Sequence, residues 1–154
     1  MDQIKQPMRF EDLNAWQEAR QMTREIYSLT RNSKISRDFG LCDQMQRAGV
    51  STMSNIAEGF ERQHVQEKLQ FYNVAHSSTA EVRSLSYVIE DNYEGMATEA
   101  ARVREKALQC GRLLTGLIRS TEGRKRRNLT LVSFLLGALL PLAFYLLPSA
   151  FFRF

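Results

Sequence analysis

The chain has 154 residues, which is enough for one domain and little more. All 17 acidic residues lie within residues 1–123, which gives that stretch a net charge of −1, and the overall charge of +4 comes from five basic residues beyond it. A nearly neutral body argues against nucleic-acid binding through bulk charge, and two widely separated cysteines argue against a disulfide framework or a zinc motif.

Apolar residues at alternating steps of three and four predict two helices in the first part of the chain. The first helix is expected over residues 10–31, and its apolar face includes Ala15, Ala19, Met22, Ile26 and Leu29. A polar connection, NSKISR at 32–37, follows it. The second helix is expected over residues 38–60, and Leu41, Met45 and Ala48 begin its apolar face.

Two further helices complete the body of the chain. The third is expected over residues 64–92, where Leu69, Tyr72, Ala75, Thr79, Val82, Ser86 and Ile89 follow the same spacing, and DNYEG ends it. The fourth carries Ala100, Val103, Ala107, Cys110, Leu114 and Leu117. Four amphipathic helices with short connections predict an all-α, antiparallel up-down four-helix bundle over residues 1–123.

The C-terminal part has a different composition. Residues 128–152 contain no charge, and 24 residues from 129 to 152 would form a helix about 36 Å long, enough to span a bilayer. The sequence therefore predicts an added C-terminal transmembrane helix that anchors a cytoplasmic bundle to the inner membrane. A buried fifth helix, a plug within an oligomer and a re-entrant segment are the alternatives. The segment is represented by Leu129, Phe134, Leu140, Pro141, Tyr145 and Phe152.

A basic cluster precedes this hydrophobic segment at residues 124–127. Its side chains would meet anionic lipid headgroups or nucleic acid, and they belong to Arg124, Lys125, Arg126 and Arg127. The hydrophobic segment is also compatible with a membrane-perturbing effector that forms a pore. Its few polar residues, however, would provide little polar lining for such a pore.

A polar stripe runs along the second helix beside small residues. Its members are separated by four, four, three and four positions and are Arg47, Ser51, Asn55, Glu58 and Arg62. Glu81 on the third helix is close enough in the bundle to pair with Arg47 or Arg62. We interpret the six residues as a structural or interface network, in preference to a catalytic cluster or a solvated face.

The stripe also carries a resemblance to a known family. Three segments, FEDLNAWQEARQMTREIYSLT (10–30), FGLCDQMQRAGVSTMSNIAEGFERQ (39–63) and EKLQFYNVAHSSTAEVRSL (67–85), resemble the bacterial 23S rRNA intervening-sequence (S23) family. The most specific part is SxxxNIAEG at 51–59. The resemblance implies a compact up-down bundle that assembles as a ring of five. It also implies kinship with the accessory variability protein of diversity-generating retroelements, which binds nucleic acid and a reverse transcriptase.

No catalytic, cofactor or metal signature accompanies the bundle. His64 and His76 are twelve residues apart, which does not fit a paired metal site on a helix, and no glycine-rich phosphate loop or serine–histidine–aspartate set is present. We therefore expect a non-enzymatic, homo-oligomeric scaffold or adaptor without cofactor or metal. Its expected partners are copies of itself and membrane lipids, and the alternative is a nucleic-acid-binding adaptor of the retroelement accessory type.

Overall fold

The computed structural model of the protein describes the backbone of residues 9–146 and the side chains of residues 9–123. A short 3-10 helix, η1 (Phe10–Asp12), precedes four α-helices: α1 (Asn14–Thr30), α2 (Phe39–Glu61), α3 (Val65–Asn92) and α4 (Ala97–Leu146). No strand occurs within residues 9–146. The chain divides into two compact units, Met1–Thr121 and Glu122–Phe154.

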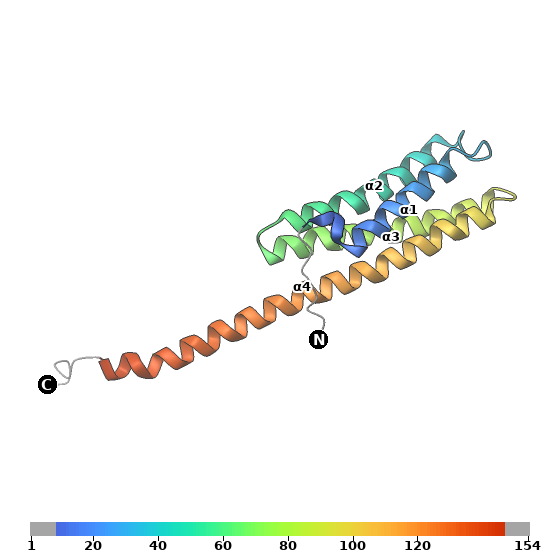
Figure 1. Cartoon of the computed structure of the whole chain (residues 1–154). Helices are drawn as coiled ribbons and strands as arrows, with labels where there is room; N and C mark the ends of the chain where they lie inside the picture. Colours follow the sequence, from blue (N-terminus) through green and yellow to red (C-terminus); the bar gives the residue numbers. More distant parts are fainter. Residues whose placement is uncertain (1–8, 147–154) are drawn as a thin grey trace. The chain divides into compact units, whose positions relative to one another are not determined.

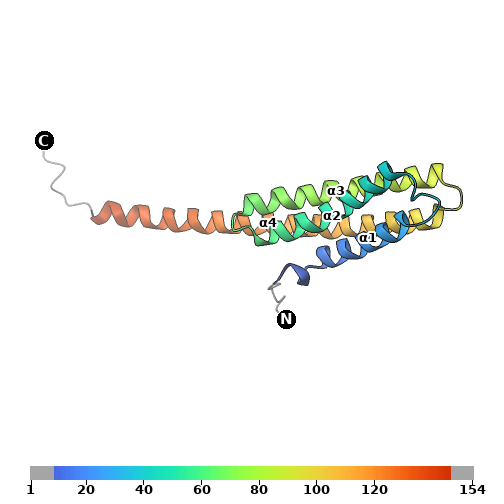
Figure 2. The same cartoon turned by 90° about the horizontal axis from the view of Figure 1, so that it is seen from above.

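The first unit is a four-helix bundle with antiparallel neighbours. Figures 1 and 2 show α1, α2, α3 and the first part of α4 side by side, with the α1–α2 and α3–α4 connections at one end and the α2–α3 turn at the other. The two connections touch, because Lys34 Nζ donates a hydrogen bond to the carbonyl oxygen of Glu94 at 2.9 Å. The predicted all-α bundle and its four helices are confirmed.

The core is built from the predicted apolar faces. Each large core side chain removed from water contributes about 1.5–3 kcal/mol, so these faces supply most of the drive to fold. The core side chains that are at most 1% exposed include Met22 and Ile26 on α1, Met45 and Ile56 on α2, Val82 and Ile89 on α3, and Val103 and Leu114 on α4.

The end of the bundle that carries two connections is fixed by polar contacts. Asp38 caps α2 by accepting a hydrogen bond from the backbone N–H of Leu41 at 3.0 Å. The Tyr93 hydroxyl, from the α3–α4 connection, donates to the other Asp38 oxygen at 2.6 Å. Gly95 has φ of 73°, a left-handed conformation that a side chain would strain, which explains the glycine two residues after Tyr93.

The prediction of an added C-terminal transmembrane helix is wrong. Helix α4 is continuous from Ala97 to Leu146, so the residues after 127 extend the fourth helix and do not begin another. Within the part of the chain that the structure describes, no helix is long and apolar enough to cross a membrane. The sequence boundary was drawn at the basic cluster, but lysine and arginine favour helix and do not end one. The predicted membrane anchor rested on the uncharged stretch 129–152, and no helix among the described residues meets the length and hydropathy that such an anchor needs.

The residues that represented the predicted membrane segment are placed as follows. Five of them lie within α4, namely Leu129, Phe134, Leu140, Pro141 and Tyr145. Phe152 lies outside the described residues. The basic cluster Arg124, Lys125, Arg126 and Arg127 is part of α4, and its side chains are outside the described set.

Candidate functional site

Two polar side chains of the predicted network, Ser51 and Asn55, meet a third from outside that network, Ser78, between α2 and α3. The hydroxyl oxygens of Ser51 on α2 and Ser78 on α3 are 2.9 Å apart. Asn55 Nδ2 donates to the Ser51 carbonyl oxygen at 2.8 Å and to its hydroxyl oxygen at 3.1 Å. Ser78 is buried, whereas Ser51 and Asn55 are half-buried. These contacts join the centres of two neighbouring helices and leave one side of the cluster open to solvent.

The charged members of the predicted network make separate contacts on the surface. Arg47 pairs with Asp43 at 3.2 Å, one turn away on α2. Glu58 pairs with Arg62 at 3.9 Å, and their side chains are 53% and 44% exposed. Exposed pairs one turn apart contribute little, about 0.3–0.5 kcal/mol.

Glu81, which was expected to pair with an arginine of the stripe, has a different partner. Its carboxylate accepts a hydrogen bond from Gln44 Nε2 on α2 at 3.1 Å. Within one chain the six residues therefore divide into separate contacts. Whether they form an interface with another chain stays a prediction.

The glycines beside the stripe are explained by packing inside the bundle. A Cβ added at Gly59 would lie 2.6 Å from a ring carbon of Tyr72 on α3, closer than Cβ atoms are found. One added at Gly49 would lie 2.9 Å from the side chain of Ile26 on α1. Thr23 Oγ1 donates to the Gly49 carbonyl oxygen at 3.0 Å, which fixes α1 against α2 at that point. The small residues beside the stripe therefore permit close helix packing, and the helices that approach are α1 and α3 of the same chain.

The outward face of α2 and α3 carries small, mostly uncharged side chains. We define this α2–α3 face by Ser51, Ser54, Asn55 and Ala57 on α2 and Val74, Ser77, Glu81 and Val88 on α3. Val74 is 44% exposed and Val88 is 41% exposed. Single exposed apolar residues are common, but two valines on one face beside a half-buried polar cluster give a surface with little to repel a second helix.

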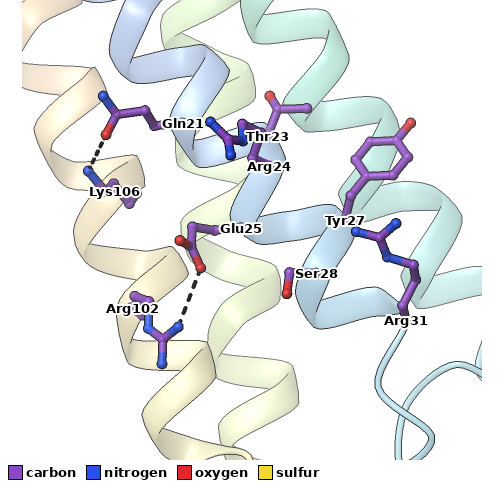
Figure 3. A pocket seen from close by; sticks show the side chains of 9 residues that line it. All are labelled: Gln21, Thr23, Arg24, Glu25, Tyr27, Ser28, Arg31, Arg102 and Lys106. Atoms are coloured by element: carbon purple, nitrogen blue, oxygen red, sulfur yellow. Dashed lines mark hydrogen bonds and ion pairs between the residues drawn. The ribbon is translucent and has the colours of Figure 1, made fainter.

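A cationic groove lies over the outward face of α1. It has a volume of about 690 Å³, and its lining includes Arg24, Tyr27 and Arg31 on α1 and Arg102 and Lys106 on α4. Figure 3 shows Glu25 linked to Arg102 and Gln21 linked to Lys106, whereas Tyr27 and Arg31 lie toward the α2 side of α1 and Arg24 lies between the two groups. The distances are 3.6 Å from Glu25 Oε2 to the Arg102 guanidinium and 2.8 Å from Gln21 Oε1 to Lys106 Nζ.

A buried carboxylate lies beneath this groove. Glu18 on α1 is 6% exposed, and its Oε1 is 3.0 Å from Lys106 Nζ. That oxygen has no hydrogen-bond partner, so the contact with Lys106 is an ion pair without hydrogen-bond geometry. Burial, and next the nearby Glu18 charge, raise the pKa of the Cys110 thiol to about 12. The cluster is therefore a buried structural contact between α1 and α4, and its thiol is held protonated at neutral pH.

The predicted absence of metal and catalytic chemistry concerns two histidines above all. His64 is exposed before α3, and His76 Nε2 lies 3.4 Å from the Thr115 hydroxyl on α4. Within residues 9–146, no three histidine, cysteine, aspartate or glutamate side chains are placed to hold a metal ion. That the protein is not an enzyme stays a prediction.

The groove was missed by the sequence analysis, although one signal for it was present. Arg24, Tyr27 and Arg31 are separated by three and four residues, which places them on one face of a helix. Only the apolar face of this helix was considered at the sequence level. Its walls come from α4, about 80 residues later in the chain, and only the fold brings Arg102 and Lys106 to it.

Comparison with known proteins decides the family. The family model described as "23S rRNA-intervening sequence protein" matches residues 11–116, which is most of the bundle. The chain belongs to the 23S rRNA intervening-sequence family. The match contains the whole of the SNIAEG segment and ends before the basic cluster, so the S23 resemblance carried by the three quoted segments is confirmed. No curated protein matches the chain.

A solved structure supports the bundle architecture of the S23 family. It is the crystal structure of a protein with unknown function from the S23 ribosomal protein family of Bacteroides thetaiotaomicron. The two chains are 17% identical and superpose with a TM-score of 0.61 over 68% of this chain and 97% of the other. At that identity the similarity establishes the fold alone.

Proposed function

We propose that this S23-family protein is a non-enzymatic scaffold that assembles with copies of itself through the α2–α3 face. The observation that carries the proposal is the Ser51–Asn55–Ser78 cluster. It lies at the middle of that face, half-buried, and the Asn55 side-chain oxygen accepts no hydrogen bond from the residues that the structure describes. A second chain on this face would supply a donor and remove the cluster from water.

The composition of the face favours a helical partner. Ser54, Ala57 and Ser77 have short side chains, so another helix can approach the backbone closely, and Val74 and Val88 supply apolar area. At the rim, Glu58 is paired with Arg62, and within the face Glu81 is the one charged residue, hydrogen-bonded to Gln44. Docking therefore leaves few uncompensated charges to desolvate.

The predicted arrangement is a closed ring, and the family resemblance implies five copies. A ring forms when the patch on one chain meets a different patch on the next and the rotation closes. A stable interface of this kind buries about 800 Å² on each partner, which two adjacent helices of this length can provide. The number five rests on the resemblance and is part of the proposal.

Light scattering on the full chain tests the assembly. We expect a species larger than a dimer, and we expect the double variant Ser54→Arg, Ser77→Arg to shift it to smaller species while circular dichroism remains helical. Both serines are exposed, so the arginines meet nothing in the single chain. The matched control is Ala101→Arg on the exposed side of α4, which should leave the assembly intact. A monomeric native protein would contradict the proposal.

The second candidate function is a nucleic-acid-binding adaptor, with a reverse transcriptase as a further partner. It is favoured by four successive basic residues, 124–127, which continue α4 beyond the family match. Electrostatic binding of this kind weakens steeply as salt rises. A gel shift with RNA or DNA that depends on salt and survives removal of residues 124–154 would place the contact on the bundle. A shift that disappears with that segment would assign it to the basic cluster.

A further inference from the structure

The cationic groove over α1 contains two arginines that the fold itself does not use. Of its four basic residues, Arg102 faces Glu25 and Lys106 faces Glu18 and Gln21. Arg24 and Arg31 are exposed and form no ion pair with any residue that the structure describes. Their positive charge is therefore available to a ligand, and arginine favours ligands that accept two parallel hydrogen bonds, as phosphate does.

The two arginines are placed to act on one small molecule. Arg31 directly follows the last residue of α1 with a helical backbone conformation, so its separation of seven residues from Arg24 corresponds to about 10 Å along the helix axis, and Tyr27 lies between them. Long arginine side chains can close that separation over a chain of two or three phosphates. The groove volume of about 690 Å³ is within the range of small-molecule sites, about 300–1,000 Å³.

Tyr27 also connects the groove to a second hollow. That hollow, between α1 and α2, has a volume of about 360 Å³, and Gln46 and Val50 are among its lining residues. Tyr27 lines both spaces, and it is 39% exposed. The two charged residues of the second hollow, Asp43 and Arg47, are paired with each other, so this space has no net charge. An aromatic ring at the border of a cationic space and a neutral one suits a ligand with phosphates at one end and a flat ring at the other.

We propose that this groove binds a nucleotide, with its phosphates on Arg24 and Arg31 and its base against Tyr27. The groove itself contains no residue of the α2–α3 face, although the second hollow reaches Ser51 at the edge of that face. Nucleotide binding is a function beyond the scaffold role. The Ser28 hydroxyl on the groove lining is a further polar group for the ligand. The carboxylate of Glu25 stays engaged with Arg102 and does not oppose the phosphates.

Titration calorimetry on the full chain tests the nucleotide site. We expect ADP to bind, inorganic pyrophosphate to bind more weakly, and adenosine to bind weakest. The double variant Arg24→Gln, Arg31→Gln should weaken ADP binding by about a hundredfold, about tenfold for each charged hydrogen-bonding group. Tyr27→Ala should weaken the binding of ADP but not that of pyrophosphate, because it removes only the stacking surface.

The matched control is Arg83→Gln, Arg119→Gln, which removes the same charge from exposed positions outside the groove lining. It should leave ADP binding unchanged. No binding of ADP by the native protein, or equal losses in the two double variants, would overturn the proposal. Binding of oligo(dT) that is lost in the Arg24→Gln, Arg31→Gln variant, in a protein that does not bind ADP, would also overturn it, because the groove would then follow a nucleic-acid backbone.

Discussion

Gly59, the last residue of the SNIAEG segment, gives the sharpest prediction about the family motif. A Cβ at this position would be 2.6 and 2.8 Å from two ring carbons of Tyr72 and 3.1 Å from Phe71 Cβ. Ordinary carbon–carbon contacts are about 3.5–4.0 Å, so the Tyr72 ring would have to move by about 1 Å. Tyr72 is only 2% exposed, so its ring has no solvent-filled space into which it can move.

The expected cost follows from two opposed effects. Overpacking a full core lowers the free energy of unfolding by about 1–3 kcal/mol. Replacing a glycine inside a helix with alanine raises it by at most about 1 kcal/mol. This gain in helix stability is smaller at Gly59 because α2 ends two residues later, at Glu61. We therefore expect Gly59→Ala to lower the free energy of unfolding by about 1–2 kcal/mol.

Urea unfolding followed by circular dichroism measures this change. Gly116→Ala is the matched control, since a Cβ there meets nothing within 4 Å. It should raise the free energy of unfolding by about 0.5–1 kcal/mol, as expected for an open glycine inside a helix. If Gly59→Ala were as stable as the native protein, the close approach of α2 and α3 would not be the reason for the motif glycine.

Three further predictions address the polar contacts and the thiols. Glu58→Ala should change the free energy of unfolding of the dissociated chain by less than about 0.5 kcal/mol, because the ion pair of Glu58 with Arg62 is exposed. If urea unfolding showed a larger loss of stability, the Glu58 side chain would have to be buried. The Tyr93 hydroxyl lowers the pKa of Asp38, so this contact stabilises the fold above the unfolded carboxyl pKa of about 3.9 and is lost as pH falls through the folded value. Tyr93→Phe should therefore be less stable than the native protein at pH 7, and the difference should narrow in acid unfolding curves; a difference independent of pH would exclude Asp38 as the partner. Cys42 and Cys110 are both buried free thiols with raised pKa values, so neither should react with Ellman's reagent at pH 8 until the protein is denatured, and rapid reaction in the native state would contradict their burial.

The helices could be predicted because the buried face of each one appears in the sequence as apolar residues spaced three or four positions apart. Met22 and Ile26, four residues apart, are both fully buried, and the third helix ends at Asn92 as the turn sequence indicates. Whether a polar residue is buried or exposed depends less on the residues near it in the sequence. Asn55 and Glu58 are both polar and three residues apart, yet Asn55 is half-buried beside Ser51 and Glu58 is exposed.

Two errors show where sequence reasoning lost information. The basic cluster was taken as the end of the fourth helix, but helix propensity, which is local, has no break there. The groove was missed because its charge balance depends on which cations are already paired, and Arg102 is paired with Glu25 only through the packing of α4 on α1. Neither separation in the sequence nor composition carries that information.

The buried ion pair between Glu18 and Lys106 has a consequence for the register of α4. Moving α4 by one heptad along α1 would place either Leu113 or Glu99 opposite Glu18, and neither supplies a cation. The slipped bundle would keep an apolar seam, but it would bury a carboxylate without a counter-charge, at a cost of several kcal/mol. One acidic residue between α1 and α4 thus fixes the register of the two helices, because it disfavours the misaligned pairings that a heptad pattern alone would allow.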